Sequence, residues 1–402
     1  MMRRVPFVVL VLLAAPAAAQ PADELSIERF VELVRRHGPA ARAARARIAV
    51  ADAETDLAGV YPNPELGYVF MGRFDGTDQA INGTQHQVWI DVPILVAGQH
   101  EARRAAAAAE ARAVREEVEL ELLELEVEAR RAFVSLLAAQ ERVGRLEAAR
   151  TELDGIASLV AERTAAGAQS HYDAARVGLE IARVDAELAA AHADLIAARA
   201  AVAALAGRPG WEPHASGDLE SIRIEFGPGD GLPAVRAMER RVRAAELDVT
   251  RAERERVPEI RVGVGAYLTS DPDSGSVYAG LSAPLPIFDT GEAAVSRARA
   301  AHGAAVERRA EVEARTRARL AGARAALRAR SEALARFDAE MRSRLPSLQA
   351  MAEASYRLGA SSVFELLDGF RARFEVELQR IELLAALRQA EIDVLAVTGA
   401  RR

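Results

Sequence analysis

The 402-residue chain contains no cysteine, and lysine is also absent from its printed sequence. The missing cysteine excludes a disulfide, a thiolate metal site and a cysteine nucleophile. The missing lysine excludes a Schiff base and a lysine-dependent phosphate loop. Aromatic residues make up only 5% of the chain, while alanine dominates many segments. Alanine, arginine, leucine and glutamate together favour long packed helices over compact cores of bulky residues.

The charge balance and the scattered histidines exclude further classes of function. The 52 basic residues stand against 59 acidic ones, a formal net charge of −7, so we do not expect nucleic acid as a partner. The seven histidines show no H-x-x-x-H or HExxH spacing, and we expect neither a metal site nor another bound cofactor. Because no nucleophile–base pair appears either, an enzyme is not expected.

The N-terminus has the layout of a secretory signal peptide, which we place at residues 1–19. Two arginines precede an apolar stretch, and Ala17-Ala18-Ala19 fits a cleavage site for small residues. An N-terminal membrane anchor is the alternative, but the apolar stretch is too short to cross a bilayer. No later stretch approaches about 18 uncharged apolar residues, so no transmembrane helix is expected. Without cysteine, the exported chain is not expected to be a lipoprotein.

Proline and glycine residues recur at an almost constant offset, which indicates an internal duplication. The matching pairs are separated by 192 to 194 positions and follow the same order in both halves: Pro39 and Pro233, Pro64 and Pro258, Pro93 and Pro286, Gly98 and Gly291, Gly167 and Gly359, Gly207 and Gly399. We therefore divide the mature chain into a first repeat, 20–208, and a second repeat, 219–399. Neither repeat is expected to be a domain by itself.

Each repeat is expected to hold a leading helix, two strands and two long helices. The leading helices are predicted at 27–60 and 234–256, the strands at about 64–72, 85–95, 258–269 and 276–286, and the long helices at 98–164, 170–206, 290–358 and 362–397. Apolar residues spaced by four and three, from Val118 to Leu146 and from Val177 to Leu205, predict coiled-coil seams. Within 290–358 only Pro346 interrupts the helical pattern, and it fits the first residue of a new helix.

The four extended segments alternate apolar residues with polar or small ones over about 9–11 residues, the length of a tilted membrane strand. Alternation alone favours a soluble antiparallel sheet with one face on a core. Export, the long helices and the duplication favour membrane strands instead. Because four strands cannot close a barrel and lipid does not tolerate open edges, two or three chains would have to pool their strands.

Three sets of motifs give the chain a resemblance to a known family. The first repeat carries Asn63-Pro64-Glu65-Leu66 and Val92-Pro93-Ile94 with Gly98, and the second carries Val257-Pro258-Glu259-Ile260 and Leu285-Pro286-Ile287-Phe288-Asp289 with Gly291. The third set of motifs is the continuous run from Tyr356 to Asp368, in the second repeat. On these residues the chain resembles the TolC family of outer-membrane efflux channels over essentially its whole mature length.

The resemblance implies a mainly helical fold with a membrane β-barrel portion, in which three chains form one twelve-stranded barrel and a periplasmic helical barrel. It implies a passive channel in the outer-membrane lipid of a Gram-negative bacterium. The expected partners are two further copies of the chain, a periplasmic adaptor protein and an inner-membrane transporter.

The ends of the two helical hairpins are the candidate site. Gly167 and Gly359 fit helix ends that need a positive φ, while Ser170 with Asp173 and Ser362 with Glu365 fit capping boxes. By resemblance, Gly167, Ser170, Gly359, Ser361 and Ser362 belong to the tips that meet the adaptor, and Glu365, Asp368, Tyr356 and Asp173 belong to a periplasmic constriction. Six carboxylates from Glu365 and Asp368 of three chains would attract cations. The family's lock arginine falls at Ser361 here, which leaves Arg371 and Arg373 as candidates.

Other functions stay open at this point. A periplasmic adaptor would show one hairpin flanked by small β-domains, and a structural coiled-coil protein of the envelope would need no alternating strands. For the channel, the compact chain resembles the outer-membrane components of heavy-metal pumps of the cobalt–zinc–cadmium type. Drug efflux and type I protein secretion are the alternatives.

Overall fold

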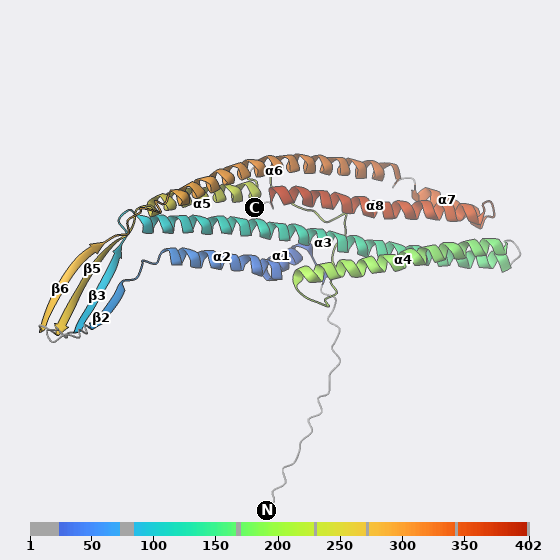
Figure 1. Ribbon diagram of the computed structural model, residues 1–402. Coiled ribbons are helices and arrows are strands. Elements are labelled where there is room, and N and C mark those ends of the chain that lie inside the picture. Colours follow the sequence, from blue (N-terminus) through green and yellow to red (C-terminus); the bar gives the residue numbers. More distant parts are fainter. Residues whose placement is uncertain are drawn as a thin grey trace, which may run out of the picture.

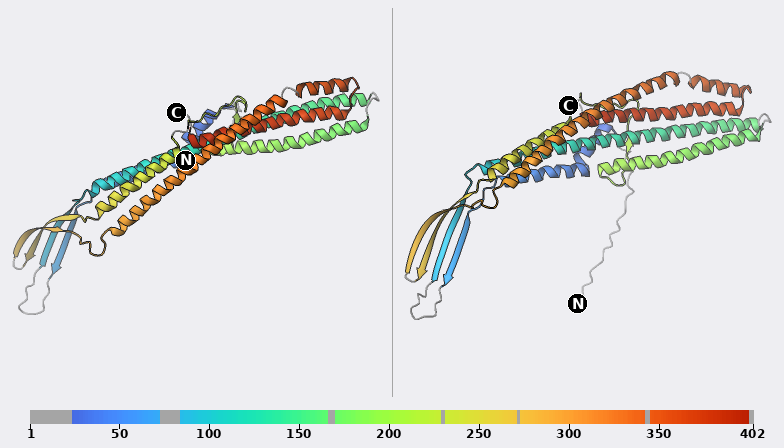
Figure 2. Two further views of the ribbon diagram at one scale, coloured as in Figure 1. Left: turned by 90° about the horizontal axis from the view of Figure 1, so that it is seen from above. Right: turned by 45° about the horizontal axis from the view of Figure 1, so that its top comes forward.

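The computed structural model describes residues 24–72, 84–165, 170–228, 231–270, 273–341 and 345–399. The predicted signal peptide and Gly167 lie outside these ranges. The molecule is a long rod, with a β-sheet at one end and two helical hairpins reaching the other (Figure 1). Turned views show the same separation between the sheet and the hairpin ends (Figure 2).

Long helices form most of the rod. They are α3 Gln99–Ala165, α4 His171–Ala206, α6 Glu292–Met341 and α8 Val363–Thr398. Shorter helices accompany them, α1 Ile27–His37, α2 Pro39–Ala58, α5 Pro233–Glu255 and α7 Leu345–Arg357. Helix α3 alone has 67 residues, a length of about 100 Å at the usual rise per residue.

Two of the expected helices are divided in the structure. The prediction of one helix at 27–60 was wrong, because Gly38 separates α1 from α2 and Pro39 begins the second helix. A proline has no N–H to continue the hydrogen-bond ladder, and its ring fits the first turn of a new helix. The new helix predicted at Pro346 is confirmed: α6 ends at Met341, and α7 begins at Leu345 with Pro346 in its first turn.

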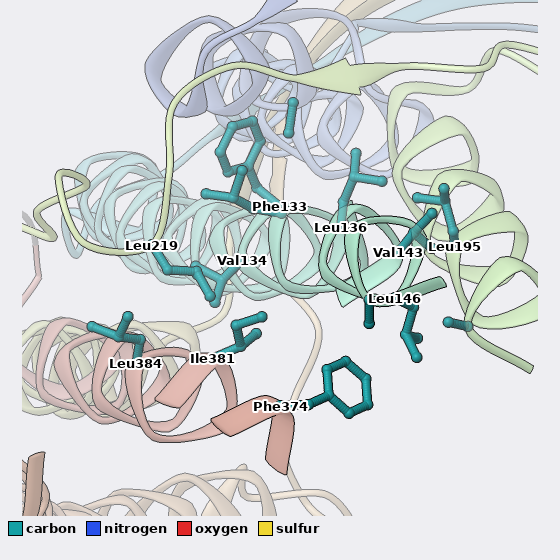
Figure 3. Close-up of a cluster of buried hydrophobic side chains, with 14 of the residues drawn as sticks. Phe133, Val134, Leu136, Val143, Leu146, Leu195, Leu219, Phe374, Ile381 and Leu384 are labelled. Atoms are coloured by element: carbon teal, nitrogen blue, oxygen red, sulfur yellow. The ribbon is translucent and has the colours of Figure 1, made fainter. Parts of the chain in front are cut away.

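The seams predicted in α3 and α4 are confirmed by burial. In α3, Val118, Leu122, Leu136 and Leu146 are buried, and in α4 the seam residues from Val177 to Val202 are buried or packed against the same cluster. Figure 3 shows the centre of this core, where side chains of α3, α4 and α8 meet. The core therefore lies along the rod, between the helices of the two repeats.

A four-stranded antiparallel sheet occupies the other end, in the order β2-β3-β5-β6. Its strands are β2 Glu65–Gly72, β3 Thr84–Ile94, β5 Ile260–Ser270 and β6 Asp273–Ser282. The fourth strand was expected at 276–286, but it ends before Pro284 and Pro286, which cannot donate to a ladder. A separate parallel pair, β1 Glu24–Leu25 and β4 His214–Ala215, lies near mid-rod.

The pairing register gives this sheet two chemically different faces. What we call the apolar face carries Leu66, Phe70, Val88, Ile90, Val92, Val262, Val264, Leu268, Val277 and Leu281. What we call the polar face carries Glu65, Gln85, Gln87, Trp89, Asp91, Arg261, Tyr267, Ser276, Tyr278 and Ser282. No described helix covers the apolar face, where Leu66 is 74% and Val277 86% exposed. The two outer strands, β2 and β6, each have one unpaired edge within the chain.

Leu219, where the second repeat begins, is bonded to helices of both repeats. Glu141 of α3 accepts a hydrogen bond from the Leu219 N–H at 2.6 Å, and the buried Arg388 of α8 donates to the Leu219 carbonyl at 2.9 Å. Burial raises the pKa of Glu141, although the bond from Leu219 opposes that shift. Leu219 itself is fully buried, so the connection is part of the core rather than a loose linker.

Helix α4 is long and apolar enough to cross a membrane by length and composition alone. This differs from the sequence expectation, which required an uninterrupted run of uncharged residues. Alanine supplies much of the apolar character, and most of the helix surface stays uncovered within one chain. The buried seam of α4 nevertheless packs on α3, as in a helical bundle.

Candidate functional site at the hairpin ends

The ends of the α3–α4 and α7–α8 hairpins lie close together at the end of the rod opposite the sheet (Figures 1 and 2). Helix α4 begins after Ser170, whose side-chain oxygen accepts from the Asp173 N–H, while the Asp173 carboxylate accepts from Ser170. Helix α8 begins in the same way after Ser362, which is paired with Glu365. Both predicted capping boxes are therefore present, and they fix where each returning helix starts.

Gly359 ends α7 with a φ of +74°, in the left-handed region. Its N–H donates to the Tyr356 carbonyl at 3.0 Å, and the Ala360 N–H reaches back to the Ser355 carbonyl at 2.9 Å. This pair of bonds is the Schellman arrangement, which needs a residue that tolerates positive φ. The matching position in the first hairpin, Gly167, lies outside the described residues.

Glu365 and Asp368 are both exposed on the first turns of α8. Their separation by three residues puts them on one side of the helix. One oxygen of Glu365 accepts from the Ser362 N–H at 2.9 Å, so this carboxylate is held in place by the cap. The arrangement presents two negative charges to solvent at the end of the molecule.

Tyr356 differs from the acidic residues because its side chain is fully buried. The guanidinium of Arg163, from the end of α3, lies 4.9 Å from the centre of the tyrosine ring and donates to the Tyr356 carbonyl. Burial raises the pKa of the Tyr356 hydroxyl, and the positive charge of Arg163 opposes that rise. That Tyr356 belongs to a periplasmic constriction stays a prediction, since a constriction would form between chains. Within the chain, Tyr356 joins the ends of α3 and α7.

Two buried polar atoms at the tip have no hydrogen-bond partner in the part of the chain that the structure describes. They are the hydroxyl groups of Tyr356 and of Ser361, the position that replaces the expected lock arginine. Asp173 contributes a negative charge near Tyr356, but its carboxylate is bonded to Ser170.

Arg371 of α8 bridges to Glu180 of α4 and so connects the two hairpins. Its Nε lies 2.8 Å from one carboxylate oxygen, while Arg183 donates to the other oxygen at 2.7 and 2.9 Å. The Glu180 side chain is only 1% exposed. Burial alone would raise the pKa of Glu180, but hydrogen bonds from Arg371 and Arg183 outweigh it and lower the pKa. Glu180 is therefore held as a buried carboxylate between two guanidinium groups.

Arg373 makes a second bridge, from α8 to Glu152 of α3. Both side chains are about one-quarter exposed, at 25% and 24%. Burial raises the pKa of Glu152 in spite of the neighbouring Arg373 charge. The two arginines that the sequence left open thus both connect α8 to the first hairpin.

No group of three or more His, Asp or Glu side chains within the described ranges lies close enough together to hold a metal ion. The exposed carboxylates of the tip can attract cations electrostatically.

Comparison with known proteins identifies the family of the chain. The model of the outer membrane efflux protein family matches residues 31–208 and 231–400, which include both repeats. The chain belongs to the outer membrane efflux protein family. No curated protein is similar enough in sequence to be recognised as a relative.

Solved structures share the fold of this outer membrane efflux protein. A membrane protein from Pseudomonas aeruginosa has a TM-score of 0.77 and 19% identity, over 93% of this chain and 90% of that one. CusC, described as forming a transmembrane channel, has a TM-score of 0.76 and 16% identity over 93% and 92% of the two chains. The outer membrane protein VceC of Vibrio cholerae gives 0.71 and 16% over 93% and 96%. The fold is thus TolC-like, as the motifs implied.

Three participants in the tip of this efflux protein were not foreseen from the sequence: Arg163, Glu152 and Glu180. Glu180 offered a signal, because it lies between the seam residues Val177 and Val184 and so carries a charge into an apolar stripe. A buried charge needs a partner, which Arg371 supplies from the other repeat. Nothing in the sequence specified that pairing across 191 residues.

Proposed function

We propose that three copies of this chain form the outer-membrane channel of a tripartite efflux pump, a passive conduit from periplasm to exterior. The observation that carries the proposal is the four-stranded sheet, with its uncovered apolar face and its free edges at β2 and β6. Open edges are not stable in lipid, so further chains must pair with them. Three chains supply twelve strands, enough for one closed barrel. Each chain would be exported, lose its signal peptide and insert its sheet into the outer membrane.

The surface of α4 supports an oligomer. Tyr172, Leu179 and Ile196 are 66%, 73% and 66% exposed, and they lie on a stripe of otherwise small alanine residues. Such a stripe allows a second helix to approach closely. A neighbouring chain that covers α4 would remove these side chains from water.

In the proposed trimer, Glu365 and Asp368 form the periplasmic constriction. Two carboxylates from each of three chains would make a ring of six negative charges, which repels anions and concentrates cations. Arg371 with Glu180 and Arg373 with Glu152 keep the α7–α8 hairpin against α3 and α4, and these bridges would hold the closed state.

The outer surface of the tips is the proposed docking site for the helical hairpin of a periplasmic adaptor. By the family resemblance, the docking residues are Ser170, Gly359, Ser361 and Ser362, together with Gly167, which lies outside the described residues. Leu358 and Phe364 expose apolar surface at the second tip, at 84% and 57%. Exposed apolar groups at a rod end fit a partner that is itself helical and partly apolar.

The test is the ion selectivity of the purified protein in planar bilayers. The wild-type channel should prefer cations, and the double variant Glu365→Gln with Asp368→Asn should lose most of that preference. The matched control, Glu212→Gln with Asp194→Asn, removes two exposed carboxylates away from the tips and should leave the reversal potential unchanged. Equal selectivity of wild type and tip variant would show that these carboxylates do not form the constriction.

Three classes of substrate are candidates: heavy-metal cations, drugs and secreted proteins. A deletion strain would show hypersensitivity to cobalt, zinc or cadmium salts if the metal resemblance holds, and to organic compounds if drug efflux does. Retention of a secreted protein in the cell would instead indicate type I secretion.

A further inference from the structure

Aromatic side chains lie on the polar face of the sheet, where a water-filled lumen is expected. One row of paired residues crosses all four strands and reads Gly67, Trp89, Gly265 and Tyr278. Glycine and aromatic residues therefore alternate across the row. Membrane barrels usually concentrate such rings on the lipid side at the two interfaces, whereas Trp89 lies at the middle of β3 and faces the other way.

The Trp89 ring lies over Gly67, and the hydroxyl end of the Tyr278 ring lies over Gly265. A methyl group added at Gly67 would collide with the six-membered ring of Trp89, and one added at Gly265 would meet the Tyr278 hydroxyl oxygen at 2.6 Å. Gln87 donates to that hydroxyl at 2.6 Å, which fixes the tyrosine side chain. Packing of rings on strand glycines stabilises the sheet. Both rings keep contact with solvent on the polar face, where Tyr278 is 37% exposed and Trp89 is half-buried.

The next row on the same face is acidic. Glu65 pairs with Asp91 across β2 and β3, and Asp91 is two residues from Trp89, about 7 Å along the strand. Arg261 neutralises Glu65 at 2.8 Å, but within the described ranges no arginine lies within ion-pair distance of Asp91. The Asp91 carboxylate lies over Gly263 of β5, one row from Gly265 and the Tyr278 hydroxyl above it, while Trp89 lies over Gly67 of β2 on the other side of β3. Aromatic rings and an unpaired carboxylate on one face are a combination that attracts weakly hydrated organic cations.

We propose that the barrel lumen carries a binding site for organic cations, formed in each chain by Trp89, Tyr278 and Asp91. This inference rests on the proposed trimeric channel, in which two rings from each of three chains would form a collar of six. A twelve-stranded barrel with about 4.8 Å between strands and a tilt of about 40° has a backbone diameter of about 24 Å. Rings packed on the wall glycines leave such a channel open, so the site holds a passing solute weakly without closing the conduit.

Organic cations fit this site better than metal ions do. A hydrated divalent ion needs several oxygen, nitrogen or sulfur ligands to replace its water. The collar offers one carboxylate and two ring faces for each chain, and ring faces favour quaternary ammonium groups. The substrate class that the lumen indicates is therefore a bulky organic cation.

The experiment measures block of single-channel current by tetrabutylammonium added only on the barrel side of a planar bilayer. The wild-type channel should show concentration-dependent block, while magnesium at the same concentration should not block. Trp89→Leu should raise the half-blocking concentration by about 3-fold to 30-fold, the range expected for loss of a cation–π contact. Asp91→Asn, which keeps the side-chain shape, should also raise it.

Tyr68→Leu is the matched control, because it removes an aromatic ring from the apolar face of the neighbouring strand and should leave the block unchanged. If conducting channels show no block, or show equal block in wild type, Trp89→Leu and Asp91→Asn, the lumenal site is refuted while the channel stands. If the purified protein neither associates nor conducts, the channel and the site are both refuted. If Trp89→Leu does not assemble, Asp91→Asn alone tests the site: a raised half-blocking concentration supports it, and an unchanged one refutes it.

Discussion

Replacement of Arg371 by glutamine tests how the two hairpins are held together. Glu180 is almost completely buried, and each of its oxygens receives hydrogen bonds from a different arginine. Arg371→Gln removes the donors to one oxygen but leaves Arg183 on the other. The variant therefore has a half-satisfied buried carboxylate rather than an isolated one.

The expected cost lies between two limits. Loss of a whole buried ion-pair partner costs about 3–5 kcal/mol, whereas one unsatisfied buried acceptor costs about 1–3 kcal/mol. Because Arg183 remains and Arg371 is partly exposed, we expect about 2 kcal/mol. This loss of free energy destabilises only the closed state, in which α8 contacts α4. The ratio of open to closed channels should therefore rise by about 30-fold, since about 1.4 kcal/mol corresponds to a factor of ten.

Single-channel recordings of the fraction of time spent in the open state measure this ratio. The control is Arg131→Gln, which removes an exposed ion pair between α3 and α8, at 48% and 49% exposure, and should change the ratio by less than about fivefold. The double variant with Glu180→Gln should cost less than the sum of the two single changes. An open-state ratio equal to that of Arg131→Gln would refute the bridge as a lock.

Further outcomes follow from other parts of the rod. Gly359→Ala should lower the thermal midpoint, measured by circular dichroism, through a cost of about 1–2 kcal/mol at positive φ, whereas Gly303→Ala inside α6 should be neutral or stabilising; equal effects would contradict the turn argument. Ser362→Ala should cost about 1 kcal/mol through loss of the α8 cap, and Ser362→Asp, which can still cap, should restore most of it. The raised pKa of Glu141 means that its contribution to stability is present below its unfolded pKa of about 4.3 and is lost as pH rises through the higher folded pKa. Glu141→Gln should therefore become more stable relative to wild type between about pH 4 and neutral pH, and a pH-independent difference in thermal midpoint would contradict this.

Periodicity predicted those parts of the fold that depend on local pattern. The seams that begin at Val118 and Val177 could be predicted from the spacing of apolar residues alone, and the structure buries these residues. The break at Gly38 was missed because the apolar pattern continues through it, while the backbone turns at Pro39. The strand order was not predictable from alternation, because β3 and β5 pair across the whole first hairpin and the connecting segment.

The candidate site was predictable only where its parts are local. The serine caps and the turn at Gly359 follow from four or five consecutive residues. The partners of Tyr356 and Arg371 lie on the other repeat, at Arg163 and Glu180, and only the packed hairpins bring them together. Long-range contacts of this kind depend on which faces of two helices meet, which a single sequence leaves open.

The mass of the detergent-solubilised protein, measured by native mass spectrometry, tests the central claim most directly. Three chains pooling four strands each should give a single species of three times the mature chain mass, resistant to dissociation until heated. A species of one chain mass that keeps its helical content and resists assembly in lipid would contradict the channel, since four strands alone cannot close a barrel.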